Sequence, residues 1–204
     1  MRAASNNDVD PLDGTVKSQW IARLQTIFKS YIDNHSDILQ LRYVGVANNG
    51  KEIVRVERRD GIVSIVDDSA LQSKAQRAYF KVITKLHPGE LYVSDLNLNR
   101  EFGKLDFPYL PTLRVAMPVF DQTQKIFGFV IINIKAQVLL DEIQQDLSKE
   151  LDLYLINERG DFKIHPNNAM TFGEDLGNSN AWDDLFEPLA ADNGFSVAYD
   201  VSAG

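Results

Sequence analysis

The clearest pattern in the chain is a strand-like alternation followed by an almost wholly apolar run, within residues 112–147. Every second residue of 112–120 is apolar, which predicts a strand with one buried face. After a polar turn, 126–134 is apolar on both faces except for Asn133, so it should be a central strand covered on both sides. Apolar residues then recur at helical spacing. We expect this hairpin and helix to form the core of a domain.

The N-terminal part predicts a long helix and then a hairpin. Apolar residues from Val16 to Ile32 fall at steps of three and four, which indicates an amphipathic helix. Its apolar stripe is wide, so it either packs on its own domain or also pairs with its copy in a dimer. Strands are predicted at 38–46 and 52–56, around Asn49-Gly50, a pair that accepts positive φ and favours a hairpin turn.

The next segments predict a helix, a short strand and a long loop. Helical spacing from Ser69 to Leu86, stopped by the following Pro-Gly pair, predicts the helix. The strand is expected at 91–94. The loop at 96–111 is long for a compact domain, and such loops typically serve as lids or binding loops.

A second hairpin repeats the first one weakly. Strands are predicted at 151–156 and 161–165 around Gly160, and placing Gly160 on Gly50 aligns the two hairpins. Each hairpin also follows an amphipathic helix. Chance similarity is the alternative. A helix near 181–190 and a strand at 195–201 complete the pattern, so the second domain should be shorter than the first, or incomplete.

Composition narrows the class of protein. Net charge of −8 argues against a surface that tracks nucleic-acid phosphates, and against adsorption of the domain body to an anionic membrane. The absence of cysteine excludes disulfides and thiolate chemistry. No apolar run reaches the roughly 18 residues of a membrane span, and no signal peptide is visible. The chain is therefore soluble as given, or a soluble piece from between two spans, which its strand-like end favours.

No catalytic centre is expected in this sequence. The three histidines, His35, His87 and His165, lie far apart, and common hydrolase, phosphate-loop and dinucleotide motifs are missing. Asp67-Asp68 precedes the predicted helix and is better explained as N-terminal charge than as a metal site. We expect no catalytic residue, no metal and no cofactor.

A candidate ligand pocket remains. Arg77 is suited to a carboxylate or phosphate, and nearby tyrosines could supply walls and hydroxyl donors. The alternative is that Arg77 forms a surface ion pair and the tyrosines belong to the core. The candidate ligand-binding residues are Arg77, Tyr79, Tyr92, Asp95, Arg114 and Asn133.

This order of elements resembles the double Cache (tandem PAS-like) extracytoplasmic sensor domains of bacterial receptors, and most closely those of sensor histidine kinases. The resemblance covers about residues 16–204. It is carried by 39–44 with 50–55, by 77–80, by 92–97, by 118–121 with 128–134, and by 160–166.

The resemblance implies an α+β fold with two PAS-like domains built on antiparallel sheets. It divides the chain into an N-terminal helical segment at 1–37, a membrane-distal sensor domain at 38–135, a connecting helix at 136–150 and a truncated membrane-proximal domain at 151–204.

The resemblance also implies roles for the pocket residues. Amino-acid sensors of this family grip the ligand carboxylate with an Arg-x-Trp element, which Arg77-Ala78-Tyr79 resembles, and Tyr92 corresponds to an assisting tyrosine. Where those sensors use an aspartate for the ligand's amino group, this chain has Asn133. A neutral amide has no charge to offer an ammonium group, so a small carboxylate or another polar metabolite is favoured.

The expected function is ligand sensing by the periplasmic part of an inner-membrane receptor, most simply a histidine kinase whose catalytic domain lies outside this chain. The ligand should bind under the 96–111 loop, and closure should shift two N-terminal helices paired in a homodimer. No nucleic acid should bind, and the membrane should be reached only through flanking spans. Alternatives are a diguanylate cyclase, a chemoreceptor, a free-standing binding protein or enzyme subunit, and a purely structural dimerisation module.

Overall fold

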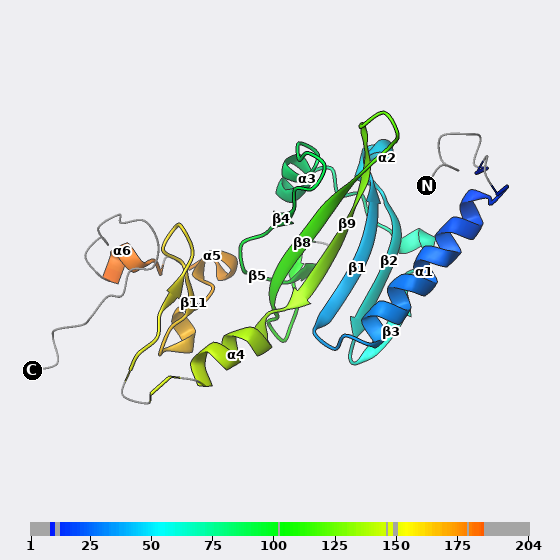
Figure 1. Cartoon of the computed structure of the whole chain (residues 1–204). Helices are drawn as coiled ribbons and strands as arrows, with labels where there is room; N and C mark the ends of the chain where they lie inside the picture. The colour runs from blue at the N-terminus through cyan, green and yellow to red at the C-terminus, as the bar shows by residue number, and fades with distance from the viewer. Residues whose placement is uncertain are drawn as a thin grey trace, which may run out of the picture. The chain divides into compact units, whose positions relative to one another are not determined.

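The computed structural model describes residues 9–10, 13–101, 103–145, 147–148, 151–178 and 180–185. The chain forms two compact units, Met1–Glu142 (unit 1) and Ile143–Gly204 (unit 2), each of which is described by itself. Both are built from helices and antiparallel strands, so the predicted α+β class is confirmed (Figure 1). None of the helices in the described ranges is both long and apolar enough to cross a bilayer.

Unit 1 is built on one antiparallel sheet with the strand order β3-β2-β1-β9-β8-β4, and β5 also pairs with β8. The expected hairpin is present as β8 and β9, and β9 lies between β1 and β8 as a central strand should. The strands of this sheet are β1 (Ile38–Gly45), β2 (Glu52–Arg59), β3 (Ile62–Ile65), β4 (Tyr92–Val93), β5 (Asn97–Leu98), β8 (Pro111–Phe120) and β9 (Ile126–Lys135).

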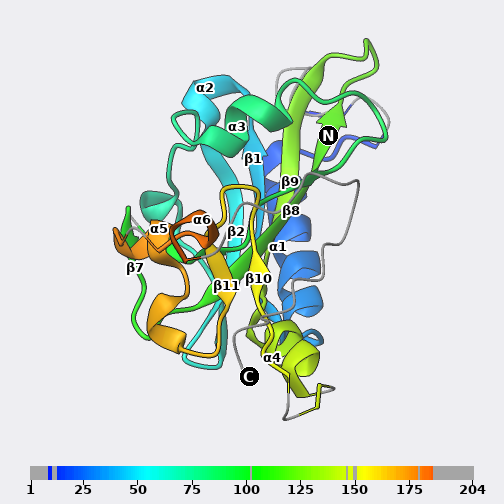
Figure 2. The same ribbon diagram turned by 90° about the vertical axis from the view of Figure 1, so that its left-hand side faces the viewer.

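Helix α1 (Lys17–Asp33) covers one face of the sheet, as its apolar stripe predicts. Phe28 and Ile32 from this helix pack on Leu41 and Tyr43 of β1 in a buried cluster. Figures 1 and 2 show α1 running along β1, β2 and β3 on the side of the sheet opposite α3.

The other face carries a second buried cluster, under the short helix α3 (Ala78–Ile83). Ile83 from this helix packs with Val44, Phe129 and Ile131 of the sheet. The apolar cluster covers only part of this face, because polar residues occupy the rest of it.

The prediction of one helix from Ser69 to Leu86 is wrong. The structure has a single 3-10 turn, η2 (Asp68–Ala70), and then no helix until α3. Residues 71–77, here called the strap, bond instead to the start of β2. Glu52 N donates to Gln72 O at 2.9 Å, and Lys74 N donates to Gly50 O at 2.9 Å. These tertiary bonds compete with the helical ones that the residue spacing suggested.

The Asn-Gly hairpin turn is longer than a two-residue turn. It contains one short helical turn, α2 (Ala47–Gly50), and both Asn49 and Gly50 have positive φ, at 59° and 64°. The 96–111 loop is also partly structured. Besides β5, its described residues form β6 (Arg100–Glu101) and β7 (Lys104–Leu105), a two-stranded hairpin separate from the main sheet.

Unit 2 contains the second predicted hairpin in shortened form. Helix α4 (Gln137–Gln145) crosses the boundary between the units and is shorter than the predicted connecting helix at 136–150, since the described residues 136 and 147–148 are not helical. The predicted strand at 195–201 and residues 186–190 of the predicted helix lie outside the described residues. The elements of unit 2 are β10 (Leu155–Ile156), β11 (Phe162–Ile164), η3 (Asn168–Met170), α5 (Gly173–Leu176) and α6 (Trp182–Leu185).

The two hairpins share a hydrogen-bonding pattern as well as a sequence pattern. In each, the glycine carbonyl accepts a bond from a downstream segment, and the residue after the glycine forms an isolated bridge to that segment. The matching contacts are Gly50 O with Lys74 N (2.9 Å) and Lys51 with Ser73 in unit 1, and Gly160 O with Trp182 N (2.8 Å) and Asp161 with Ala181 in unit 2. This agreement supports the internal repeat.

Candidate functional site

A cavity of about 210 Å³ lies in unit 1, on the sheet face that α3 partly covers. Its walls come from β1, β8 and β9, from the strap, from α3 and from β4 to β6. The residues that line it are Gln40, Arg42, Lys74, Arg77, Ala78, Tyr79, Tyr92, Ser94, Asn97, Arg100, Glu101, Arg114 and Asn133.

The structure brings five of the six predicted site residues together in this cavity. They are Arg77, Tyr79, Tyr92, Arg114 and Asn133. Asp95 is exposed and is not among the lining residues. Its Oδ1 accepts a hydrogen bond from Leu96 N at 2.9 Å.

Strand register explains why polar side chains meet here. Gln40 on β1 lies opposite Glu57 on β2 and Asn133 on β9, and Asn133 lies opposite Arg114 on β8. Because alternate residues of a strand share a face, Arg42 lies on the same face as Gln40. Four strands therefore contribute one polar row across this face of the sheet, and Arg42 lies beside it.

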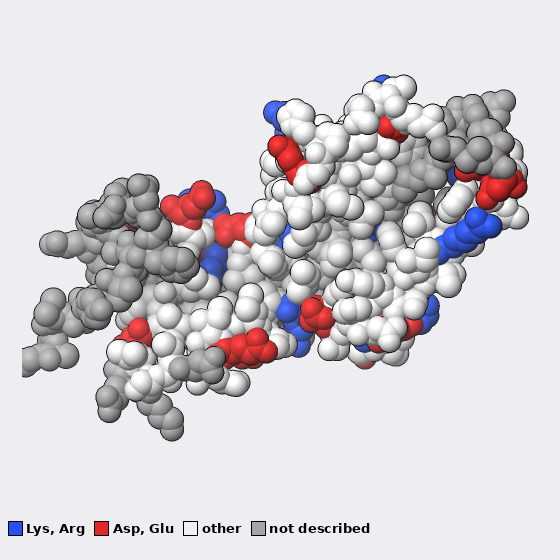
Figure 3. All heavy atoms as spheres, in the orientation of Figure 1, with Lys and Arg blue, Asp and Glu red and all other residues white. Residues whose placement is uncertain are grey.

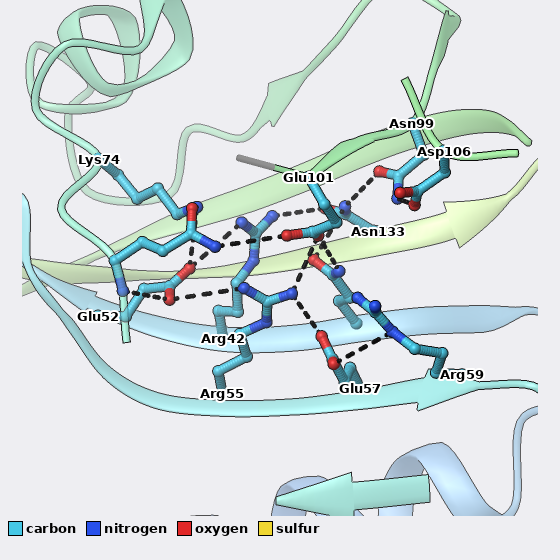
Figure 4. Close-up of polar contacts among 12 residues, drawn as sticks. Arg42, Glu52, Arg55, Glu57, Arg59, Lys74, Asn99, Glu101, Asp106 and Asn133 are labelled. Atoms are coloured by element: carbon cyan, nitrogen blue, oxygen red, sulfur yellow. Dashed lines mark hydrogen bonds and ion pairs between the residues drawn. The ribbon is translucent and has the colours of Figure 1, made fainter. Parts of the chain in front are cut away.

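Asn133 is the hub of this row (Figure 4). Its Oδ1 accepts a hydrogen bond from Arg42 Nη2 at 2.6 Å. Its Nδ2 donates to Gln40 Oε1 at 3.3 Å and to Asn99 Oδ1 at 3.4 Å. Arg114 Nη2 also donates to Asn99 Oδ1, at 3.5 Å. An amide suits this position because it must accept from a guanidinium and donate to two oxygens, and an ionised aspartate has no donor.

Behind the cavity, one buried acid holds three cations. Glu52 is 1% exposed. Its carboxylate oxygens lie 3.5 Å from Arg42 Nη1, 3.3 Å from Lys74 Nζ and 3.9 Å from Arg55 Nη1. A buried ion pair is stable only when its partners remain in place, so Glu52 fixes Arg42 and Lys74 at the cavity wall.

Lys74 is less basic than a surface lysine. Burial, reinforced by the nearby Arg42 charge, lowers the pKa of Lys74 from 10.5 to about 8, although Glu52 opposes the shift. The ammonium group also donates to Gln72 Oε1 at 2.8 Å. Lys74 is therefore mainly a cation at neutral pH and loses its charge just above it.

Glu101 brings an acid into the cavity wall from β6. Its Oε1 accepts from Gln40 Nε2 at 2.5 Å and lies 3.0 Å from Arg55 Nη2, and its Oε2 accepts from Gln72 Nε2 at 3.4 Å. Burial favours the protonated acid, but the Arg55 charge and the Gln40 bond outweigh burial and lower the pKa of Glu101. Glu101 is thus an ionised carboxylate at neutral pH.

The opposite wall is aromatic. The rings of Tyr79 and Tyr92 lie 6.5 Å apart, and Tyr79 packs edge-on against Phe129. Burial raises the pKa of Tyr92, so its phenol stays protonated. Neither phenol is hydrogen-bonded to another residue that the structure describes, so both remain as potential donors to a ligand.

The charges that line the cavity are strongly unbalanced. Five lining residues are cationic and only Glu101 is acidic. Cations that converge on a small hollow attract an anion and repel an ammonium group. On the face shown in Figure 3, by contrast, Lys and Arg of the described residues form only small separate groups. The arrangement is therefore suited to a small anion.

Sequence reasoning missed several lining residues, and two of them had a signal. Gln40 and Arg42 are polar residues inside an otherwise apolar strand, which is the same feature that singled out Asn133. Lys74, Arg100 and Glu101 had none, because their position depends on where the strap and the 96–111 loop fold back.

A larger hollow of about 710 Å³ lies elsewhere in unit 1, beside the N-terminal part of α1. Its charges balance, with three lysines and three acids, and its floor is formed by apolar side chains such as Ile21, Ile53 and Phe127. Size alone does not make a ligand site, and the charged groups of this hollow offer no excess of either sign. In the described part of the chain, no three His, Cys, Asp or Glu side chains are placed to share a metal ion.

Comparison with known proteins identifies a family. Residues 15–185 match the family model described as bacterial histidine kinase, sensor domain. A search of curated proteins gave no match.

Several solved structures have a similar fold. A domain of a sensory box/GGDEF family protein from Vibrio parahaemolyticus has a TM-score of 0.63 and 22% identity, over 78% of this chain and 58% of that one. The extracellular domain of the histidine kinase vpHK1S-Z8 has a TM-score of 0.61 and 23% identity, over 78% and 55%. The ligand-binding domain of the Campylobacter jejuni chemoreceptor Tlp3, in complex with L-valine, has a TM-score of 0.54 and 15% identity, over 76% and 55%. The chain thus spans between 55% and 58% of the length of these three structures.

Proposed function

Because this chain belongs to the family of bacterial histidine kinase sensor domains, we propose that it is the periplasmic ligand-sensing region of a transmembrane sensor histidine kinase. In this proposal unit 1, with its sensor domain at 38–135, is the membrane-distal domain. The 136–150 segment connects it to a membrane-proximal PAS-like domain that begins at 151. The ligand is a small anion, and the kinase chemistry lies outside this chain.

The observation that carries the ligand class is the excess of cations around the cavity. Arg42, Lys74, Arg77, Arg100 and Arg114 line it with one acid, Glu101, and Glu52 pairs with two of these cations from behind. A cavity of about 210 Å³ has room for about seven water molecules at roughly 30 Å³ each. A metabolite of a few carbon atoms with a carboxylate fits this volume and this charge.

Arg77 is the residue that tests the site best. It is half-buried in the cavity wall at the start of α3, and its side chain forms no ion pair with any other described residue. A thermal-shift screen of small carboxylates, amino acids and amines should give carboxylate hits with the wild-type chain. Arg77→Ala should lose these hits, because a guanidinium that faces the ligand carboxylate supplies charge-assisted hydrogen bonds.

The matched control is Arg59→Ala. Arg59 lies outside the cavity and its side chain is 59% exposed, so this variant should keep every hit. If the hits survive Arg77→Ala, or if amines stabilise the chain and carboxylates do not, the proposed site is wrong.

The proposed homodimer uses the outer face of α1. Ile27 and Tyr31 lie one helical turn apart on this helix and are 61% and 44% exposed, so they form part of an apolar stripe that the sheet does not cover. Light scattering at high protein concentration should detect a dimer. Ile27→Lys should shift the chain to monomer without lowering its melting temperature. A wild-type chain that stays monomeric would contradict pairing in the isolated domain.

The type of receptor can be read from the complete gene. A histidine kinase of this architecture requires membrane spans on both sides of the sensor region and a kinase domain after the second span. A cyclase or chemoreceptor output domain would contradict the kinase, and a gene without spans would favour a free-standing binding protein.

A further inference from the structure

Glu101 is the one acid among the described residues that line the cavity, and its carboxylate makes the contacts expected of a bound anion. It receives hydrogen bonds from the Gln40 and Gln72 amides. It also forms an ion pair with Arg55 (Figure 4). These partners come from β1, the strap and β2, and Gln40 is the one of the three that lines the cavity. A ligand carboxylate that entered the cavity would seek the same donors.

The segment that carries Glu101 is a small hairpin outside the main sheet of unit 1. The β6–β7 hairpin has only two paired positions, Arg100 with Leu105 and Glu101 with Lys104, and it forms a sheet of its own. Its base is closed by the hydrogen bond from Asp106 N to Asn99 O at 3.0 Å. The Glu101 side chain contacts both the sheet and the strap.

Removal of Glu101 from its position would not leave Arg55 without a partner. Arg55 also pairs with Glu57 and lies 3.9 Å from Glu52. The two amides would be left with free donors beside Arg42, whose charge also lowers the pKa of Glu101. The site can therefore exchange one carboxylate for another without a buried charge being left uncompensated.

We propose that Glu101 is a built-in competitor of the ligand: a ligand carboxylate displaces the Glu101 carboxylate from Gln40 and Gln72, and this displacement releases the β6–β7 hairpin. The inference rests on the proposed binding of a small anion in this cavity and adds its regulation. Occupancy by ligand and attachment of the hairpin become mutually exclusive, so the hairpin reports whether the site is filled.

The test is chemical rescue with acetate. In the full chain, Glu101→Ala removes the internal carboxylate and leaves its donors in place. Acetate should then raise the melting temperature of Glu101→Ala by about 3 °C at a concentration about tenfold above its Kd. Wild type, in which Glu101 occupies the position, should shift by less than about 1 °C. Sodium chloride at the same ionic strength is tested in place of acetate, so that binding of acetate is distinguished from screening by salt. The matched control variant is Glu90→Ala, which removes an exposed acid outside the cavity.

Equal acetate shifts in Glu101→Ala and wild type would overturn the proposal, as would no shift in either.

If Glu101→Ala fails to fold, the isosteric Glu101→Gln replaces it, with hydrogen exchange as the readout. Amides of 100–101 and 103–105 should then exchange at least tenfold faster than in wild type, with the β8–β9 amides unchanged. Equal rates would contradict the release of the hairpin. Arg77-dependent carboxylate hits would keep the proposed function intact even if both Glu101 tests failed.

Discussion

Arg42 on β1 and Asn133 on β9 are joined by a hydrogen bond of 2.6 Å between Arg42 Nη2 and Asn133 Oδ1. The two residues are 4% and 2% exposed. The amide that interrupts the apolar β9 strand thus orients a guanidinium at the wall of the cavity, and the two strands are tied together at this point by their side chains as well as their backbones.

Asn133→Leu should destabilise unit 1 by about 2 kcal/mol, because it removes the acceptor for Arg42 and leaves buried polar groups of Gln40 and Asn99 without their donor. Urea unfolding measures the loss. Asn97→Leu is the control: Asn97 also lines the cavity, but its side chain has no hydrogen bond to another described residue. Asn97→Leu should change the free energy of unfolding by no more than about 0.5 kcal/mol. Equal losses would show that the Asn133 bonds contribute nothing specific.

Lys74 should make stability depend on pH above neutrality. Its pKa in the folded chain is about 8, below the ordinary 10.5. Between these values the unfolded chain binds more protons at Lys74 than the folded chain, so the contribution of Lys74 to stability rises with pH in this window. The melting temperature of wild type relative to Lys74→Met should therefore increase from pH 8 to pH 10.

The control for Lys74 is Lys81→Met, at an exposed lysine on α3. The difference in melting temperature between Lys81→Met and wild type should not change from pH 8 to pH 10. Anion binding should change in the opposite direction, weakening as pH rises through 8, because the cavity loses one cation. A constant difference between wild type and Lys74→Met would contradict a depressed pKa.

Gly50→Ala should destabilise the chain strongly. Gly50 has φ of +64°, and a Cβ there would lie 2.6 Å from Phe80 Cε2 and 2.9 Å from Ala75 N. Left-handed strain of about 1 to 2 kcal/mol adds to a packing clash of about 1 to 3 kcal/mol. Gly61→Ala is the control, because its φ is +79° and no atom lies within 4 Å of the added Cβ. Thermal unfolding should show the larger loss for Gly50, and equal losses would contradict the close contact with the strap and α3.

In unit 2, Lys163→Met should open the hairpin locally. Lys163 Nζ lies 2.7 Å from Asp161 Oδ2, and the two side chains are 2% and 3% exposed. Loss of the lysine leaves a buried carboxylate without its cation, which costs about 3 to 5 kcal/mol. Hydrogen exchange of the β10–β11 amides should accelerate. The control is Arg159→Ala, which breaks the exposed ion pair with Glu174. It should lower the free energy of unfolding by less than about 1 kcal/mol. Comparable acceleration in both variants would contradict the difference between buried and exposed pairs.

The elements that periodicity predicted best were those with two independent signals. Helix α1 combined a wide stripe with polar flanks, and the β8–β9 hairpin combined alternation with a polar turn. The predicted helix over 69–86 failed because Gln72 and Lys74 bond to the start of β2. Helical spacing of apolar residues cannot reveal that a neighbouring strand end offers competing donors and acceptors.

The candidate site divides in the same way. Five of its six predicted residues line one cavity. Asn133 was predicted because it interrupts an apolar strand, and the other four because they are arginines or tyrosines on or beside the predicted helix and strands. Asp95 was placed there by its nearness in sequence to Tyr92, and it faces solvent instead. Glu101 could not be predicted, since its role depends on how the β6–β7 hairpin folds back over the sheet.

The sequence by itself determined the α+β class, the central hairpin, the covering helix and the presence of an arginine, two tyrosines and an amide suited to a polar ligand. It did so because side-chain alternation and helical periodicity are local properties of the chain. Only the tertiary structure decided the charge of the cavity. Strand register aligns Gln40, Asn133 and Arg114 across β1, β9 and β8, and the strap and the β6–β7 hairpin then add Lys74 and Glu101 from distant parts of the chain. Because charge acts through space, the sign of the site was fixed only when these segments came together.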